Sequence, residues 1–379
     1  MAQNVDIKAD DVAALATFAR QNHIDFTVVG PEAPLSMGIV DEFRGQGMAI
    51  FGPSSGAARI ESSKVFAKEL MHRYGIPSAC SRSFSSYNEA SSYVQQASTP
   101  IVIKADGLAA GKGVTVAQTT DQAMEALEAM MLLRNFGRAG DRVVIEECLS
   151  GREISFFAFT DGATVLPMVP ACDYKRIFDG NSGPNTGGMG SYSPPEFYSS
   201  SLGEVVMRTI MEPTIRAMRN ELNIYEGVLY GGLMITAGGP KVIEFNARLG
   251  DPETQVVLPR LESDLVEVIL AVIDKRLASI RLDWNPKPCV CVVVASGGYP
   301  AVYRTGFPIT GLGDVDSDVM VFHAGTKSGS ARQILTSGGR VLAVAALGDS
   351  VASARQKVYN NISRISFEGM YFRKDIALF

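Results

Sequence analysis

The sequence is poor in cysteine, has no dense run of positive charge and contains no long apolar run. Its five cysteines, among 379 residues, are scattered without metal-ligand spacing, which predicts free thiols in a reducing compartment and a cytoplasmic location. A net charge of -5 offers no basic field, so we expect no nucleic-acid partner. No apolar run reaches about 18 residues and no charged-then-apolar leader opens the chain, so neither a membrane span nor a secretory signal is expected.

What is present describes a folded protein with an ample core, since 46% of residues are hydrophobic and 20% charged. The length suggests two or three domains at about 150 residues each. Residues 10–22 and 37–46 have helical patterns, and residues 26–29 and 49–51 read as short buried strands that each end in Gly-Pro. This order predicts parallel strands.

The first Gly-Pro turn is a candidate substrate loop. In open α/β sheets, ligands bind beyond the carboxyl ends of the strands, where Gly30, Pro31 and Glu32 fall. The alternative is that both Gly-Pro pairs are plain turns.

A loop rich in glycine and lysine lies between two β-branched runs at residues 101–116. Lys104 ends the first run, and Gly107, Gly111, Lys112 and Gly113 follow. Glycines let backbone N–H groups approach phosphate oxygens, and lysines add positive charge. The spacing and the following strand exclude a Walker A loop. The pattern predicts a strand-loop-strand flap over a nucleotide, with an ordinary Gly-rich hairpin as the alternative.

The helix before this loop carries a lysine in its first turn. It is predicted over 62–74, with Ser62 or Ser63 as N-cap and Lys64 beside it. A cation there opposes the helix dipole, so a nearby anion would account for it; a solvated lysine is the alternative. A helix at 121–131 and strands at 143–149, 154–159 and 164–169 then favour an α+β grasp over a doubly wound sheet.

Residues 173–195 lack periodicity and are rich in Gly, Pro, Asn and Ser. Long structureless loops in compact proteins are commonly functional, so we interpret this segment as a substrate-enclosing loop; a flexible linker is the alternative.

Strands are predicted again at 227–236 and 241–248. Alternation would place Glu244, Asn246 and Arg248 on one face of the second strand. A carboxylate and an amide oxygen two residues apart suit Mg²⁺, which is commonly shared with substrate phosphates. An ion pair between Glu244 and an arginine such as Arg248 is the alternative.

Together these features resemble the ATP-grasp superfamily and, within it, the glycinamide ribonucleotide synthetase family. The resemblance runs over about residues 4–376 and rests on strings at 29–35, 104–113, 183–190, 244–246 and 248–255. It continues into the family's C-terminal pattern at 296–300, 303–306, 322–327 and 338–340.

The resemblance implies a multidomain fold of α/β and α+β type. An ATP-grasp core, with a small subdomain at 63–150 and a large one at 151–284, would lie between a truncated parallel α/β domain at 1–62 and a small β-rich domain at 285–379. The implied reaction joins glycine to phosphoribosylamine at the expense of ATP, with Mg²⁺ or Mn²⁺, in a monomer.

The resemblance also assigns roles to residues. Lys64, Lys104 and the 107–113 loop would bind the ATP phosphates, Glu147 and Leu149 the adenine, and Glu153 the ribose, with Glu146 beside it. Glu244 and Asn246 would bind the metal. The implied catalytic residues are Lys104, Arg248 and Asp251. The residues implied around glycyl phosphate and ribose phosphate are Asp173, Arg176, Pro184, Asn185, Thr186, Gly187, Gly188, Arg248, Gly250, Asp251, Pro252 and Glu253.

The chain departs from the family pattern at its beginning. Family members open with a strand and a Gly-Asn-Gly-Gly-Arg-Glu-His loop that serves the phosphoribosylamine phosphate, whereas Met1 stands just before a helix. We therefore expect at least one βαβ element to be absent, through a start placed downstream, a fragment, or a shortened paralogue. A non-catalytic ATP-binding remnant and another carboxylate-amine ligase are the alternative functions.

Overall fold

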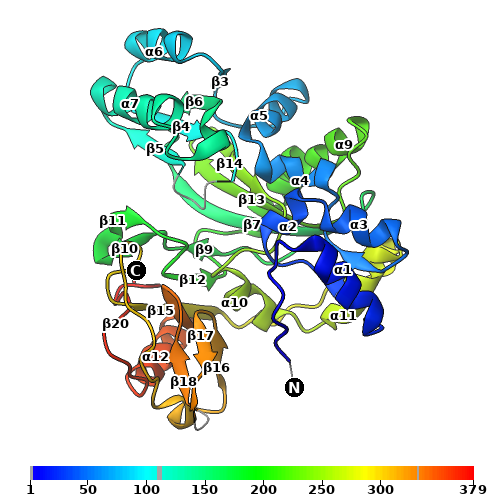
Figure 1. Ribbon diagram of the computed structural model, residues 1–379, viewed down its shortest axis with the longest axis vertical. Coiled ribbons are helices and arrows are strands. Elements are labelled where there is room, and N and C mark those ends of the chain that lie inside the picture. Colours follow the sequence, from blue (N-terminus) through cyan, green and yellow to red (C-terminus); the bar gives the residue numbers. More distant parts are fainter. Residues whose placement is uncertain (1–2, 109–112, 331–332) are drawn as a thin grey trace. The chain divides into compact units, whose positions relative to one another are not determined.

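The computed structural model describes residues 3–108, 113–330 and 333–379. The chain forms two compact units, each assembled from separate segments and each with its own sheets (Figure 1). The first unit takes Met1–Pro167, Ser199–Leu249 and Leu265–Arg281, and the second takes Met168–Tyr198, Gly250–Asp264 and Leu282–Phe379. The chain thus passes between the units several times, once between Leu249 and Gly250.

The first unit opens with a small α/β region. Its elements are α1 (Val12–Gln21), β1 (Thr27–Val28), α2 (Glu32–Ser36), α3 (Ile39–Gly45), β2 (Ile50–Phe51) and α4 (Ser55–Ser62). Strands β1 and β2 pair in parallel, which confirms that prediction. The expectation of a buried first strand is wrong for Val28, which is 45% exposed, because the described residues form a sheet of only two strands here.

A four-stranded antiparallel sheet follows, in the order β3-β6-β4-β5. Its elements are α5 (Lys64–Arg73), β3 (Ser81–Phe84), α6 (Tyr87–Gln96), β4 (Ile101–Ala105), β5 (Val114–Ala117), α7 (Thr120–Leu127), the helical turns Glu128–Leu132 and Gly137–Gly140, and β6 (Val143–Glu147). The sequence analysis missed β3 and α6. Polar and serine-rich stretches form both, and only a few apolar side chains, such as Ala90 and Val94, reach the core.

Side-chain alternation divides the two faces of this sheet. Ile101 and Ile103 of β4, with Val143 and Ile145 of β6, pack in one core with α6 and α7. The intervening positions, including Lys104, point to the other face, because successive strand residues alternate. Two adjacent buried strands therefore carry polar groups on the face away from α6 and α7.

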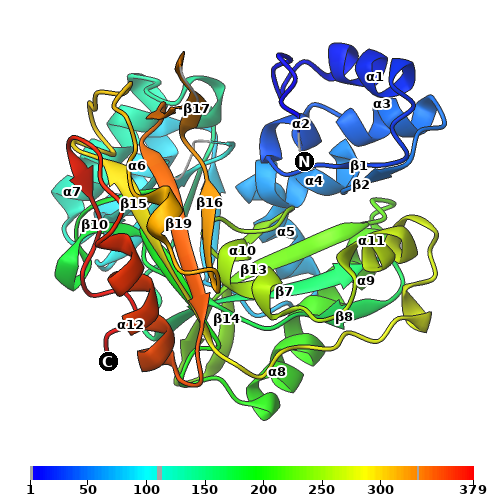
Figure 2. The same ribbon diagram turned by 90° about the horizontal axis from the view of Figure 1, so that it is seen from below.

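The second sheet of this unit has the order β14-β13-β7-β8 and is antiparallel (Figure 2). Its strands are β7 (Arg152–Thr160), β8 (Val165–Pro167), β13 (Gly227–Thr236) and β14 (Gly239–Asn246). The helices of this part are α8 (Ser200–Val206), which continues through Met207–Met211 into α9 (Glu212–Asn220), and α11 (Leu265–Ile273), followed by the turn Leu277–Ser279. The strands predicted from sequence in this part are confirmed.

The second unit is built on a six-stranded sheet. The order is β16-β19-β15-β12-β9, and β20 also pairs with β15. The strands of the unit are β9 (Cys172–Asp173), β10 (Arg176–Phe178), β11 (Ser182–Asn185), β12 (Gly190–Ser193), β15 (Cys289–Ser296), β16 (Val319–His323), β17 (Thr326–Ser328), β18 (Ile334–Thr336), β19 (Arg340–Leu347) and β20 (Met370–Tyr371). Its helices are α10 (Thr254–Val257) and α12 (Val351–Ile362), with short turns at Asp179–Asn181, Leu258–Arg260 and Leu312–Asp314.

The core of the second unit lies between this sheet and α12. Val290, Val292 and Val344 pack against Ala354 and Val358, and all five are fully buried. The cysteines confirm the prediction of free thiols. Cys289 and Cys291 lie two residues apart on a buried strand, and all five cysteines are free thiols.

The prediction of a structureless loop at 173–195 is wrong. Strands β10 and β11 form a hairpin, and β12 pairs with both β15 and β9. Backbone pairing, with a few buried side chains such as Ile177, Met189 and Tyr192, orders this segment. Glycine and serine can therefore occupy strand positions that show no apolar periodicity. The segment is therefore part of the scaffold of the second unit rather than a linker.

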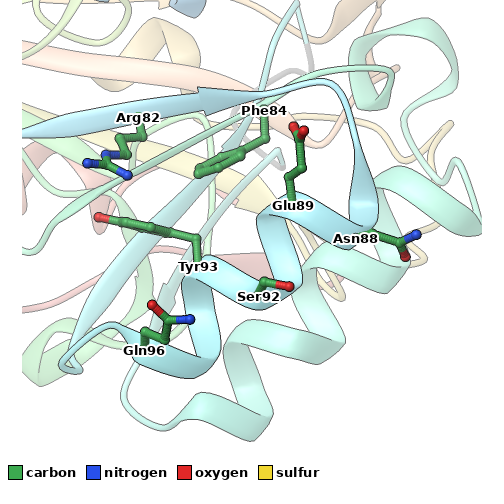
Figure 3. A pocket seen from close by; sticks show the side chains of 7 residues that line it. All are labelled: Arg82, Phe84, Asn88, Glu89, Ser92, Tyr93 and Gln96. Atoms are coloured by element: carbon green, nitrogen blue, oxygen red, sulfur yellow. The ribbon is translucent and has the colours of Figure 1, made fainter.

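The described part of the chain also has a shallow pocket between β3 and α6 (Figure 3). Tyr93 lies at its centre, with its ring centroid 5.3 Å from that of Phe84 and 5.4 Å from Arg82 Cζ. Its other lining residues are Asn88, Glu89, Ser92 and Gln96. None of the residues predicted to bind a ligand lines this pocket. Over the described residues, the helices are all too short or too polar to cross a bilayer.

Candidate active site

The N-terminus of α5 is joined to the base of the glycine-rich loop. Ser63 caps the helix, and the Asp106 carboxylate accepts hydrogen bonds from Ser63 Oγ (3.0 Å) and the Val65 N–H (3.1 Å). Lys64 Nζ donates to the Gly107 carbonyl at 3.0 Å. Asp106 is thus an anion at the N-terminus of α5, as we expected from the presence of a lysine in the first turn of that helix.

The loop begins at a position that requires glycine. Gly107 has φ of +151°, and a Cβ there would lie 2.7 Å from the Ala139 Cβ. Strands β4 and β5 pair antiparallel on either side of the loop, as predicted, and the Ala105 N–H donates to the Gly113 carbonyl at 2.9 Å. The predicted phosphate-binding residues Gly111 and Lys112 lie outside the described residues.

Lys104 belongs to a buried cluster of charges. Its ammonium forms an ion pair with one oxygen of Glu146, and the Lys68 ammonium pairs with the other. All three residues are buried: Lys104 is 3% exposed, Glu146 5% and Lys68 6%. Burial lowers the pKa of Lys68, and the Glu146 carboxylate opposes that shift. Glu146 is predicted to lie beside the ribose, and its carboxylate contacts these two lysines.

A bulge in β14 gives Lys104 a second partner. Gly232 of β13 faces Glu244 and Leu233 faces Val242, so Ile243 is an extra residue in the ladder. Lys104 Nζ donates to the Ile243 carbonyl at 2.9 Å. The bulge precedes Glu244, and beyond it half-buried Glu244 and Asn246 alternate with buried Phe245, as predicted. The prediction is wrong for Arg248, because β14 ends at Asn246.

The predicted adenine and ribose residues follow directly along β6 and β7. The Glu147 carboxylate accepts from the Cys80 N–H and from Lys241 Nζ, both at 3.0 Å, and these contacts lower its pKa. The Glu147 N–H donates to the Cys80 carbonyl, so the backbone group that remains to meet a base is the Glu147 carbonyl. Leu149 is half-buried, and Glu153 lies exposed near the start of β7.

The predicted metal ligands, Glu244 and Asn246, lie at the end of β14 and are both half-buried. Lys64, one of the two lysines predicted to bind phosphate, interacts electrostatically with Glu244 and with Lys104. Burial lowers the pKa of Lys64, the Glu244 charge opposes that shift and the Lys104 charge adds to it. The described residues contain no cluster of three His, Cys, Asp or Glu side chains that could hold a metal alone. Two oxygen donors beside lysines fit Mg²⁺ that completes its shell with substrate phosphates and water.

Arg248 is held by two carboxylates. Its Nε contacts Glu32 at 2.9 Å and its Nη2 contacts Glu61 at 3.2 Å, and Glu61 also accepts the Ala247 N–H at 2.7 Å. Burial raises the pKa of Glu61 to about 7, and the Arg248 charge opposes that rise. Glu32 begins α2 directly after Pro31, so the structure joins the predicted substrate loop that begins at Gly30 to the predicted catalytic arginine.

In the second unit, Arg340 joins the two predicted substrate segments. Its guanidinium donates to the Gly187 carbonyl (2.6 Å) and to the Asp251 carboxylate (2.8 Å). Tyr299 accepts the Gly187 N–H at 3.0 Å, and Ser191 Oγ donates to the Pro252 carbonyl at 2.7 Å. Residues 185–188 and 250–253 therefore form one site of contact within this unit.

The remaining predicted substrate residues have structural partners. Arg176 donates to the Gly183 carbonyl at 2.7 Å and pairs in register with Asn185 across the β10–β11 hairpin, which also contains Pro184. Thr186 Oγ1 donates to the Lys175 carbonyl (2.8 Å) and accepts the Gly188 N–H (2.9 Å). Asp173 contacts Lys175 Nζ at 3.8 Å, Gly250 accepts the Thr254 N–H at 3.1 Å, and Glu253 is buried at the start of α10.

Gly188 is the position in this region least tolerant of a side chain. It has φ of +109°, and an added Cβ would overlap Pro252 Cδ. We expect Gly188→Ala to lower the free energy of unfolding by roughly 1–3 kcal/mol, because strain and overlap act together. Denaturant unfolding measures this. Gly313→Ala is the matched control, since Gly313 lies in the same unit with ordinary φ and open space around it; equal losses for both variants would contradict the expectation.

Sequence reasoning missed three functional candidates, which are Lys68, Glu61 and Arg340. Lys68 lies one helical turn after Lys64, and that spacing on an amphipathic helix was the available signal. Arg340 lies in residues 338–340, one of the sequence strings that resemble the family, but the resemblance assigned no role to it. Glu61 precedes α5 by three residues and gives no signal until its partners are known.

The class of the fold follows from comparison with solved structures. Biotin carboxylase from Campylobacter jejuni, solved as a β,γ-ATP complex, superposes with a TM-score of 0.73 over 95% of this chain and 79% of that chain at 16% identity. A family model of an ATP-grasp domain matches residues 62–254. The chain therefore has the ATP-grasp fold, and the predicted fold class, with an ATP-grasp core beside an α/β N-terminal domain and a β-rich C-terminal domain, is confirmed.

The chain belongs to the phosphoribosylglycinamide synthetase family. Models of that family's N, ATP-grasp and C domains match residues 1–61, 62–254 and 289–378. A phosphoribosylamine–glycine ligase from Caldanaerobacter subterraneus subsp. tengcongensis is 50% identical over 378 residues, which cover 100% of this chain and 90% of the relative. The one from Yersinia pestis is 51% identical over 377 residues, 99% of this chain and 88% of the relative.

The solved phosphoribosylamine–glycine ligase of Thermotoga maritima has the same arrangement of elements. It superposes with a TM-score of 0.81 at 33% identity over 92% of this chain and 85% of that chain. The resemblance drawn from the sequence strings is confirmed.

Proposed function

We propose that this chain joins glycine to phosphoribosylamine in an ATP-dependent ligation that yields glycinamide ribonucleotide, ADP and phosphate in purine synthesis. The observation that carries the proposal is the match, at about half identity over the whole chain, to phosphoribosylamine–glycine ligases. The lysines grouped around the glycine-rich loop support it, because this reaction requires neutralisation of phosphate charge. We also propose a cytoplasmic location, which the free thiols support.

The chemistry proceeds in two transfers. A carboxylate is a poor acyl donor, so a glycine carboxylate oxygen first attacks the γ-phosphorus of ATP, which gives glycyl phosphate and ADP. The phosphoribosylamine nitrogen then attacks the activated carbonyl carbon, the bond to the phosphate oxygen breaks, and inorganic phosphate and a proton leave. No protein nucleophile is required, and catalysis depends on positioning and charge.

Residues of the first unit would serve the nucleotide. Lys64, Lys104 and the loop from Gly107 to Gly113 would hold its phosphates. The backbone of Glu147 and Leu149 would meet adenine, and Glu153 the ribose. Glu244 and Asn246 would hold Mg²⁺ or Mn²⁺, which when bound withdraws charge from the phosphates.

Arg248 would contact the reacting carboxyl phosphate, because Glu32 and Glu61 fix its guanidinium near the end of β14. In the second unit, the Gly187 and Asp251 segments would contribute substrate contacts, fixed by Arg340. We propose domain limits at residues 62, 150 and 284, which place the nucleotide residues in two subdomains of one core.

The decisive experiment measures phosphate release from ATP with glycine and freshly formed phosphoribosylamine, omitting each substrate in turn. We expect release only with all three present. ATP binding without release would indicate a non-catalytic remnant, and release that depends on a different amine would indicate another carboxylate-amine ligase. Either result would overturn the proposal for this chain.

Arg340 offers a test of the second unit. We expect Arg340→Lys to raise the KM of glycine or phosphoribosylamine by about ten-fold, because an ammonium cannot reproduce the forked contact to Gly187 and Asp251. The affinity for ATP should not change. Arg364→Lys is the matched control, since Arg364 likewise contacts an aspartate (Asp316, 2.6 Å) and a backbone carbonyl (Asp314, 2.7 Å) in the same unit. Steady-state kinetics with each substrate varied measures the effect, and equal changes in the two variants would refute it.

A further inference from the structure

We propose that Lys68 is a positioning residue for the nucleotide. It neutralises Glu146, so that the positive charge of Lys104 remains available to the ATP phosphates. The proposal rests on the ATP site proposed above. It adds Lys68, a residue of α5 to which the sequence resemblance assigned no role in that site.

The geometry places one carboxylate between two ammonium groups. Glu146 of β6 and Lys104 of β4 share the sheet face opposite α6 and α7, and Lys68 reaches the same carboxylate from α5. Each lysine contacts a different oxygen of Glu146. All three side chains are more than nine-tenths buried. Charges in such a site are screened weakly by solvent and act strongly on one another.

The effect of Lys68 on ATP binding follows from the net charge of the three buried side chains. With Lys104 alone, Glu146 would form a neutral pair and cancel the field of the lysine predicted to face the phosphates. With Lys68 on the second oxygen, the cluster keeps one positive charge in excess. The Ile243 carbonyl, 2.9 Å from Lys104 Nζ, fixes the direction of that ammonium without changing the count of formal charges.

Stability alone does not account for the third charge. Two buried groups of opposite sign can satisfy each other, and each further buried charge adds a desolvation cost. Among the described residues, Lys68 Nζ and Glu146 Oε2 have no hydrogen-bond partner outside their ion pair. Lys68 is thus a further buried charge whose partner, Glu146, is already paired with Lys104, and this is costly unless the excess positive charge has a use.

The test compares the binding of ATP, ADP, AMP and adenosine to the full chain by titration calorimetry. Four variants separate charge from packing: Lys68→Met, Lys68→Arg, Glu146→Gln and the double variant Lys68→Met/Glu146→Gln. We expect Lys68→Met to weaken ATP about ten-fold, with a smaller loss for ADP and AMP and none for adenosine. Lys68→Arg should stay near wild type. Glu146→Gln should bind ATP about ten-fold more tightly than wild type, because it leaves two positive charges in excess. The double variant should recover wild-type affinity, because it restores the single excess charge.

Two results would overturn the proposal. One is a loss in Lys68→Met that is equal for ATP and adenosine, which indicates a packing defect. The other is a double variant that binds ATP as weakly as Lys68→Met. If Lys68→Met does not fold, the comparison of Glu146→Gln with the double variant still decides, since the double variant should bind ATP about ten-fold more weakly. Failure of the wild-type chain to bind ATP would instead refute the proposed function.

Discussion

Replacement of Lys104 by methionine is expected to lower the rate of ATP-dependent phosphate release by about a hundred-fold or more. Loss of one group that stabilises developing phosphate charge in a water-excluded site commonly costs that much. Lys104 is 3% exposed, and Glu146 and the Ile243 carbonyl both hold its ammonium in place. Steady-state kinetics, with nucleotide affinity measured separately, would give the loss in kcat and in binding.

Lys357→Met is the control for this variant. Lys357 is also a lysine in an ion pair, with Asp318 at 2.6 Å, but it lies on the surface of α12, where such pairs contribute little. It should keep wild-type activity. Intact ATP-dependent turnover in the Lys104→Met chain would remove the nucleotide role from this cluster and from the loop beside it.

Arg248→Lys is expected to lower kcat by about a hundred-fold while ATP affinity stays near that of wild type. The guanidinium of Arg248 contacts Glu32, Glu61 and the Leu249 carbonyl at once, and an ammonium cannot hold all three. The expected loss therefore concerns the reacting carboxyl phosphate rather than the nucleotide. The contrast with Lys104→Met, which should impair both, separates the two roles.

The control for Arg248→Lys is Arg73→Lys. Arg73 pairs with Glu221 at 2.5 Å in the same unit, but its side chain is 61% exposed, so the change should leave kinetics and stability near wild type. A parallel fall in ATP affinity and kcat in Arg248→Lys would contradict the assignment, because it would place the arginine at the nucleotide.

The sequence predicted well those parts of this protein in which the local residue pattern matches the environment of the residues in the folded structure. Strands β4 and β6 are apolar and β-branched because they are buried, and Lys64 follows a serine cap because the helix begins there. The glycine-rich loop was evident from composition, whereas the reason that Gly107 must be glycine, its close approach to Ala139, comes from the structure. The roles of the site residues remain predictions that kinetics must test.

The parts that were missed depend on partners far away in the chain. Lys68 is an ordinary helix residue until Glu146 is brought to it, and Glu61 acquires its raised pKa only through burial near Arg248. The bulge at Ile243 follows from the pairing of β14 with β13, which no local pattern in β14 reveals. Segment 173–195 was misread because backbone pairing and a few irregularly spaced buried side chains, such as Ile177 and Met189, order it without an apolar period.

The two successive glutamates of β6 have a consequence for how this strand keeps its place. Glu146 enters the buried cluster and Glu147 meets Cys80 and Lys241 at the surface. A slip by one residue that brought Glu147 into the cluster would place Cys148 at the surface position and carry Glu146 to the place of Ile145, in the apolar core beside α6 and α7. The charges of β6 therefore penalise the wrong alignment on both faces of the sheet. The pairings of Glu146 with Val102 on β4 and with Ser81 on β3 fix the same register. An insertion within β6 should therefore cost more than one in the turn before it, because only the first would move a glutamate out of its place.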